Sequence, residues 1–306
     1  MHFLIFAITY PIIWLLSLLP MRLLYALSDF FYWVFYIVGY RKEVVLENLT
    51  LAFPNKELHE LKQIRKKFFR HFTDVVFESI KLISISEKEM SKKYRFTNTE
   101  LVHKLNKDGK SILLLATHYA NREYLTSFSL NTDVTYYGSY MRINNKYFEK
   151  LIIKMRSKFG MTSIKSKHAV KNIVLNNREN NQGNYLMISD QSPHHGKMHY
   201  WSEFMGVTVP VLNGAEILAK KYDFAVVNIN TTKIKRGYYE SEFSVITASS
   251  KESKNDQIIE TYLRSIEKHI RKEPEYYLWS HKRFKHRDKT PKGYQKRTSS
   301  ISNSSK

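Results

Sequence analysis

The chain has 306 residues, enough for one large domain or two small ones, and 43% of them are hydrophobic, which is sufficient for a sizeable core. It contains no cysteine, so disulfides, thiolate catalysis and cysteine-ligated zinc are excluded. The formal net charge of +21 favours an anionic partner: a nucleic acid, an acidic membrane surface, or a phosphorylated substrate or carrier. Charge alone does not choose among these classes.

Two apolar runs open the chain, at 3–19 and 23–40. The first is uncharged and at the short limit for a spanning helix. No basic segment precedes it and no small-residue cleavage site follows it, so a signal peptide is not expected. The open interpretations are a spanning helix, a helical pair that enters one leaflet, or an apolar pair in the protein's own core. Trp14 and Trp33 favour a membrane anchor over 1–40. Basic residues flank these runs and favour the cytoplasmic side: Arg22, Arg41 and Lys42.

Hydrophobic periodicity predicts the elements that follow. Apolar residues recur every three or four positions through 57–83, which predicts an amphipathic helix. Beyond residue 110, short apolar runs alternate with helical patterns, which predicts an α/β sandwich with a largely parallel sheet. The expected strands are 111–118, 134–140, 184–190, 224–232 and 240–247, and the expected helices are 146–159, 167–181, 212–222 and 256–272. We expect one catalytic-type domain over 41–287 and a disordered basic tail over 288–306.

His118 ends the strand predicted at 111–118, and Glu123 follows five positions later. In sheets of this kind, function lies at the C-terminal ends of the strands. If a helix begins after His118, the Glu123 carboxylate would accept the proton on one imidazole nitrogen and leave the other as a general base. Such a pair suits acyl transfer from a thioester to a hydroxyl that the substrate supplies. Taken alone the spacing is a weak signal, and a structural histidine explains it better than a catalytic one.

Further polar residues follow other predicted strands. Arg142 comes just after the strand at 134–140 and could clamp a phosphate through two hydrogen bonds. Asp190 ends a later buried strand and could position the acceptor or brace Arg142. His194 and His195 are adjacent in a lysine-containing loop, where simple exposure explains them better than metal binding. No metal or other cofactor is expected.

Six blocks of the sequence resemble, in order, the lipid A biosynthesis acyltransferase family, the late acyltransferases within the wider lysophospholipid acyltransferase superfamily. These blocks are LPMRLLYALSDF (19–30), VVLENLTLAFPN (44–55), ATHYANREYL (116–125), ISDQSP (188–193), FMGVTVPVLNGAEILAKKYDFAVV (204–227) and EPEYYLWSHKRFKHR (273–287). Their order and spacing over roughly 15–287 carry the resemblance. It implies a glycerol-3-phosphate acyltransferase-like fold, a mixed and largely parallel sheet flanked by helices, behind N-terminal membrane-associating helices.

The resemblance also implies roles for individual residues. His118 corresponds to the general base and Glu123 to its partner. Arg142 and Asp190 correspond to substrate-positioning groups, and Asn121 matches the asparagine of the family motif and is expected to bind substrate.

The chain departs from the family motif at two positions. Ala120 stands where glycine is usual, which affects a tight turn, and Arg122 stands where tryptophan is usual. The arginine could bind a substrate phosphate or lower the basicity of the histidine. The closing block is interpreted as a strand that completes the sheet, with Tyr277 and Trp279 in the core. Its cations are expected to form a rim that attracts anionic partners: His281, Arg283 and Lys285.

Together these features predict an O-acyltransferase at the bacterial inner membrane, with its active site on the cytoplasmic side. The expected donor is acyl carrier protein, and the expected acceptor is a hydroxyl of a lipid A precursor. An acyl-CoA donor and a lysophospholipid, aminolipid or other glycolipid acceptor stay open. A basic nucleic-acid-binding protein is the rival from another class, although no recognisable binding motif supports it. A membrane scaffold without turnover is a third alternative.

Overall fold

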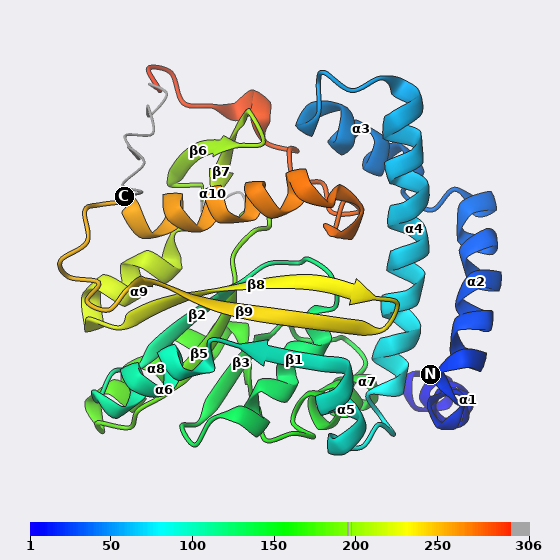
Figure 1. Cartoon of the computed structure of the whole chain (residues 1–306), viewed down its shortest axis with the longest axis horizontal. Coiled ribbons are helices and arrows are strands. Elements are labelled where there is room, and N and C mark those ends of the chain that lie inside the picture. The colour runs from blue at the N-terminus through cyan, green and yellow to red at the C-terminus, as the bar shows by residue number, and fades with distance from the viewer. Residues whose placement is uncertain (195, 197, 295–306) are drawn as a thin grey trace.

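The structure is a computed structural model that describes residues 1–194, 196 and 198–294. Among these residues the main sheet has seven strands in the order β1-β9-β8-β2-β5-β3-β4, with a separate β6–β7 hairpin (Figure 1). The strands are β1 (Tyr94–Thr97), β2 (Ile112–Ala116), β3 (Tyr136–Tyr140), β4 (Thr162–Lys165), β5 (Asn184–Ile188), β6 (Tyr200–Phe204), β7 (Val207–Val211), β8 (Ala225–Lys235) and β9 (Tyr238–Thr247).

Helices surround this sheet, and a stack of N-terminal helices lies beyond one end of it (Figure 1). The α-helices are α1 (His2–Leu18), α2 (Met21–Val38), α3 (Lys42–Ala52), α4 (Leu58–Lys81), α5 (Glu87–Lys93), α6 (Thr99–Lys107), α7 (Lys146–Arg156), α8 (Ala169–Arg178), α9 (Gly214–Tyr222) and α10 (Gln257–Lys272). The short 3₁₀ segments are η1 (Arg122–Asn131), η2 (Ser166–His168), η4 (Pro274–Tyr276) and η5 (Arg287–Lys289).

The sheet is mixed and mostly parallel, as expected from the alternation of strands and helices. Strand β2 pairs in parallel with both β5 and β8, and β3 pairs in parallel with β5 and β4. Strand β9 runs antiparallel to β8, and β1 follows β9. Every residue of β2 is buried, because helices cover both faces of the central strands. A strand buried on both faces reads in the sequence as a continuous apolar run.

Helix α4 connects the N-terminal helices to the sheet. Glu57 and Glu60 form a capping box at its start, which satisfies free backbone N–H groups of the first turn. Helix α2 packs along it (Figure 1), where the Ser28 hydroxyl donates to Asp74 (2.7 Å) and the Tyr25 hydroxyl donates to Glu78 (2.8 Å). Apolar packing and buried hydrogen bonds therefore both hold α2 on α4.

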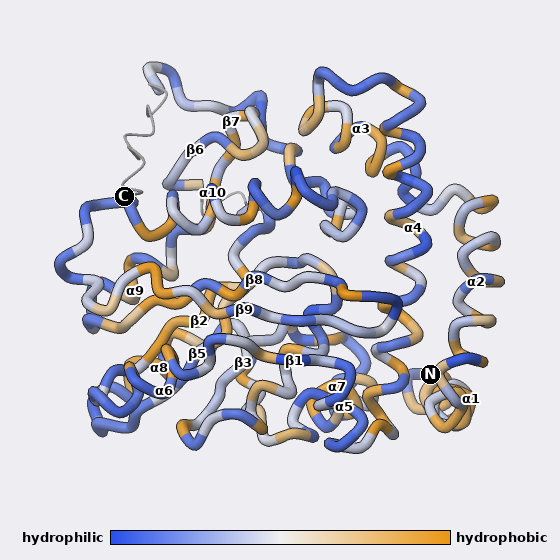
Figure 2. Tube along the Cα trace, in the orientation of Figure 1, coloured by the Kyte–Doolittle hydropathy of each residue, from blue (hydrophilic) through white to orange (hydrophobic). Residues whose placement is uncertain are grey.

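The N-terminal helices expose much apolar surface. In α1, Ile8 is 67% exposed, and in α2, Ile37 is 78% and Trp33 55% exposed. Figure 2 shows much of α1 in the colours of apolar residues. Among the described residues, α2 is the helix that is long and apolar enough to cross a membrane, and α1 is a shorter apolar helix. The interpretation of these helices as an apolar pair buried in the protein's own core is wrong, because many of their large apolar side chains face outward.

Several short elements differ from the sequence expectation. Strands β1, β4, β6 and β7 have only four or five residues each, too few to show a clear period, and were not expected. The closing block does not form a strand of the sheet: its backbone makes one isolated bridge and then turns repeatedly. In the tail expected to be disordered, Arg287–Lys289 forms a 3₁₀ turn and Tyr294 donates to the Trp201 carbonyl, whereas 295–306 lie outside the described residues.

Candidate active site

His118 lies at the C-terminal edge of the sheet and faces Asp190 from the neighbouring strand. Because β2 and β5 run parallel with Ala116 opposite Ile188, the residues two positions beyond each strand come side by side. His118 Nδ1 lies 2.6 Å from Asp190 Oδ1, and the His118 backbone N–H donates to Oδ2 at 3.1 Å. The Asp190 carboxylate is therefore the partner of the imidazole.

The surroundings of this pair fix the tautomer of the imidazole. Asp190 is 1% exposed, and burial raises the pKa of its carboxyl, but the attraction and hydrogen bonds of His118 outweigh burial and lower the pKa overall. An ionised Asp190 can only accept, so Nδ1 carries the proton. Nε2 keeps its lone pair, and the Gln191 amide lies 3.3 Å from it as a donor. A substrate hydroxyl that takes the place of the Gln191 amide at this lone pair would meet a general base.

The predicted contact between His118 and Glu123 is wrong, because Glu123 binds two arginines instead. Arg156 Nε and Nη2 lie 2.9 and 2.8 Å from its two carboxylate oxygens, and Arg122 Nε lies at 3.4 Å. Burial raises the pKa of Glu123, but these cations, Arg156 first, outweigh it and lower the pKa overall. Glu123 is therefore an ionised group that binds two guanidinium groups, and of these two arginines Arg122 lines the same cavity as His118.

The buried Glu78 carboxylate stabilises the turn after His118 through Asn121. The Asn121 side chain is 0% exposed: its amide donates to Glu78 (2.7 Å), and its carbonyl accepts from the Glu123 backbone N–H (3.1 Å). Asn121 thus caps η1 and shapes the turn, and its buried side chain uses its amide and carbonyl within the protein. Ala120, where the family has glycine, takes a left-handed backbone with φ of 52°. An alanine there is strained, which is the physical reason for the usual glycine.

The closing block supports this turn from the other side. The Ala120 N–H donates to the Tyr276 carbonyl (2.9 Å), and the Leu278 N–H donates to the His118 carbonyl (3.0 Å). Tyr277 and Trp279 are buried, as expected. The prediction that Arg283 belongs to a cationic rim is wrong, because Arg283 is 1% exposed and packs over the Phe204 ring. Of the other two cations of the expected rim, His281 is half-buried and Lys285 is exposed.

A cavity of about 190 Å³ opens beside His118, and we call it the His118 cavity. One wall is the apolar face of α4: Phe68, Phe72, Val75 and Val76. The opposite, polar wall carries His118, Arg122 and Glu123. His118 is 14% and Arg122 33% exposed in their side chains, so solvent and ligands reach this wall. The arrangement fits a hydrocarbon chain along α4 with its reactive end at the imidazole.

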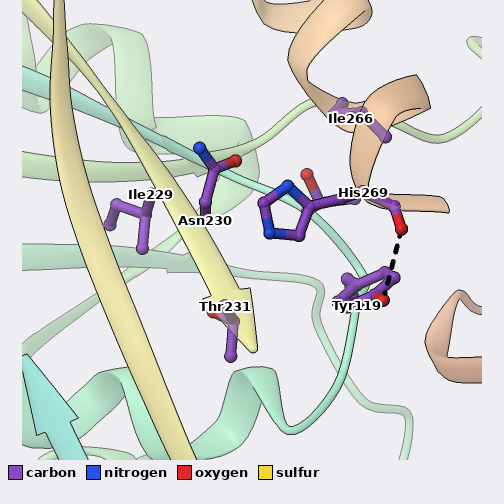
Figure 3. A pocket seen from close by; sticks show the side chains of 7 residues that line it. Tyr119, Ile229, Asn230, Thr231, Ile266 and His269 are labelled. Carbon is purple, nitrogen blue, oxygen red and sulfur yellow. Dashed lines mark hydrogen bonds between the residues drawn. The ribbon is translucent and has the colours of Figure 1, made fainter. Parts of the chain in front are cut away.

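A much smaller pocket lies next to the residues that flank His118 in the sequence. Because successive side chains alternate, Thr117 and Tyr119 face a small pocket between β8 and α10, where Asn230 and His269 also point (Figure 3). It has a volume of about 10 Å³, enough for roughly one water molecule. The Tyr119 hydroxyl donates to the Glu273 carbonyl and closes it further. A substrate therefore has room on the His118 side.

The other candidates lie apart from this pair. Arg142 is exposed beyond β3, whereas Asp190 is buried and binds His118, so Asp190 does not brace Arg142. His194 is exposed, and His195 lies outside the described residues. The sequence reasoning assigned no function to Arg156 or Gln191. Gln191 could have been found as the neighbour of Asp190, whereas the pairing of Arg156 with Glu123 depends on how α7 packs.

The comparisons with known proteins identify the family of the chain. A search of curated proteins finds no match. The family described as "Bacterial lipid A biosynthesis acyltransferase" matches residues 2–286, nearly the whole chain, and so includes the N-terminal helices, the His118 turn and the closing block. The chain is therefore an acyltransferase that belongs to the bacterial lipid A biosynthesis acyltransferase family.

Proposed function

We propose that this enzyme transfers a fatty acyl chain from acyl carrier protein to a hydroxyl of a lipid A precursor, that of a primary 3-hydroxyacyl chain. The observation that carries the proposal is the His118–Asp190 pair at the polar wall of an otherwise apolar cavity. A base of this kind next to room for a hydrocarbon chain suits a lipid hydroxyl as nucleophile. Family membership supplies the reaction class.

In the proposed reaction, His118 Nε2 takes the proton of the acceptor hydroxyl while Asp190 holds the proton on Nδ1. The acceptor oxygen attacks the thioester carbonyl carbon and forms a tetrahedral intermediate. The carbon–sulfur bond then breaks, and the imidazolium returns the proton to the departing thiolate. Asp190 stabilises the imidazolium by its charge and keeps the ring in one orientation. The substrates supply all atoms of the product ester and thiol.

We propose a supporting role for Arg122, which lies at the polar wall, and for Arg156, which binds the same carboxylate. Glu123 holds Arg156 through two hydrogen bonds and lies 3.4 Å from Arg122. Two guanidinium groups balance one carboxylate, so this corner keeps a positive charge next to the imidazole. Such a charge stabilises the negative oxygen of the tetrahedral intermediate or an anionic group of the acceptor.

We further propose that 1–40 anchors the enzyme to the cytoplasmic face of the inner membrane. The exposed apolar side chains of α1 and α2 would enter the lipid, and Trp14 and Trp33, 43% and 55% exposed, are suited to the headgroup region. The net charge of +21 adds attraction to anionic lipids, about 1 kcal/mol for each well-placed cation. The same excess favours an acidic carrier protein as donor.

The test is transfer of a labelled acyl chain from acyl carrier protein by purified enzyme and by the His118→Ala variant. We expect turnover to fall by roughly 10²–10⁴ in the variant. The variant leaves the buried Asp190 carboxylate with one donor fewer, so circular dichroism and the unfolding midpoint are measured to show that it is folded under the assay conditions. A panel with lipid A precursor, lysophospholipid and aminolipid acceptors identifies the acceptor. Normal turnover in His118→Ala would end the proposal.

A further inference from the structure

A larger cavity, distinct from the small pocket beside Tyr119, adjoins the His118 cavity, and we call it the basic cleft. It has a volume of about 520 Å³ and lies between α4, the turn that joins β8 to β9, and the segment 273–276. Figure 1 shows that this turn reaches α4. Five basic and three acidic side chains line the cleft. The two hollows share His71 and Tyr276, so they are neighbours across a single wall.

The floor of the basic cleft is a rigid network of charges. Arg236 donates to both oxygens of Asp74 (2.6–3.0 Å) and to both oxygens of Asp29 (2.9 and 3.0 Å). Lys233 Nζ lies 3.8 Å from Asp74 and 3.2 Å from His71 Nδ1, with 9% of its side chain exposed. These groups neutralise one another and fix the positions of the remaining cations.

The cations at the rim of the cleft keep unused binding capacity. Lys67 is 67% exposed in its side chain and lies 3.5 Å from Glu275, a loose contact. Arg70 is 64% exposed and lies 3.5 Å from Asp29. Lys235 is exposed, with its ammonium 4.4 Å from the centre of the Tyr238 ring. Three cations with weak contacts thus surround an open space.

The wall between the two hollows contains a polar group without a well-formed hydrogen bond. His71 is 5% exposed, its ring meets Tyr276 edge-on at 4.8 Å, and Nε2 has no hydrogen bond of good geometry, although the Ala120 carbonyl favours its charged form. Burial lowers the pKa of His71 well below its usual value, so the ring is neutral. Because Lys233 donates to Nδ1, the proton of the ring lies on Nε2.

We propose that the basic cleft binds a phosphate monoester on the headgroup of the acceptor lipid while the acceptor hydroxyl enters the His118 cavity. This inference rests on the proposed function and adds a recognition site to it. With Asp29 counted, five basic groups face four acidic ones, so positive charge remains for an anion, and a phosphate offers three oxygens to cations that approach from different sides. Lysines with mobile side chains suit a phosphate that arrives with a membrane lipid.

The test compares binding to two kinds of detergent micelle, one with phosphatidic acid, a phosphate monoester lipid, and one with diacylglycerol. The full-length enzyme is compared with Lys67→Ala/Lys235→Ala and with Lys62→Ala/Lys66→Ala. The control pair removes the same charge from exposed positions of α4 that do not line the cleft. Neither pair touches the core, so all three proteins should fold.

We expect the enzyme to prefer phosphatidic acid micelles, and the cleft variant to lose roughly tenfold to thirtyfold in affinity for them. The control should change less than about twofold, and inorganic phosphate should compete with the lipid. Equal losses in both variants, or no preference for phosphatidic acid, would overturn the proposal. The proposal would also be overturned if the cleft variant lost affinity for acyl carrier protein but kept its affinity for phosphatidic acid micelles. Because binding is measured without turnover, absence of acyl transfer would count against the proposed function and not against the cleft.

Discussion

Replacement of Asp190 by asparagine tests whether Asp190, and not Glu123, is the carboxylate that orients the His118 imidazole. The asparagine keeps the shape of the side chain but has one acceptor oxygen in place of two. In the native enzyme, one Asp190 oxygen accepts from Nδ1 and the other from the His118 backbone N–H. If the new amide group faces Nδ1, the ring proton moves to Nε2, and the lone pair that would take the substrate proton is lost.

We expect turnover to fall by roughly 10²–10⁴ in Asp190→Asn, because general base catalysis contributes about that much. Stability should fall by about 2 kcal/mol, the contribution of a hydrogen bond to a buried charge. In the native enzyme the pKa of Asp190 is lowered, so its stabilisation is complete above about pH 4 and is lost as the pH falls through the native pKa. The variant should lack this acid-dependent loss.

The assay is the pH dependence of acyl transfer and of unfolding midpoints for the native enzyme, Asp190→Asn and Glu123→Gln. Glu123→Gln releases Arg122 and Arg156 but leaves the His118–Asp190 contact, so we expect a lower rate with the native pH dependence of the base. A variant Asp190→Asn with native rate and pH dependence would refute the assignment. So would Glu123→Gln if it alone shifted the pH dependence.

Three other changes test the surroundings of the site. Ala120→Gly should raise the free energy of unfolding by about 1 kcal/mol in urea denaturation, since φ of 52° strains alanine and not glycine; a loss of stability would contradict the strained turn. Tyr25→Phe should lower it by about 2 kcal/mol, because Glu78, which is fully buried, loses one of three donors; an unchanged midpoint would show that this link contributes nothing. Val75→Trp should fill the His118 cavity and reduce kcat/KM more for long than for short acyl donors, and equal effects would place the chain elsewhere.

The position of His118 could be predicted from the sequence, but its partner could not. The apolar run of β2 and the polar residues beyond it locate the edge of the sheet, and the same logic locates Asp190 after β5. Which carboxylate meets the imidazole depends on the register of β2 against β5, a pairing of residues about seventy positions apart. Local spacing favoured Glu123 because it is near in sequence, whereas strand pairing brings Asp190 nearer in space.

The closing block shows a different limit of sequence reasoning. Its alternation of aromatic and basic residues is typical of a strand with one buried face and one solvent-exposed face. In the structure its backbone instead pairs with the His118 turn over 276–278 and then folds back, which buries Arg283 against Phe204. Pattern alone does not distinguish a strand from an irregular segment whose backbone hydrogen bonds go to another loop. The tertiary contacts at the turn decide the conformation.

Helix α4 explains why the anchor, the cavity and the cleft occur together. Its apolar residues line the His118 cavity, while Asp74 and Glu78 receive hydrogen bonds from α2 on another face. Glu78 also accepts from Asn121, which caps the segment that carries Glu123. Tyr25 of α2 and Asn121 of the turn after His118 thus share one buried carboxylate. Movement of α2 on α4 would therefore disturb the turn after His118, so the helix that we propose as part of the membrane anchor also supports the candidate site.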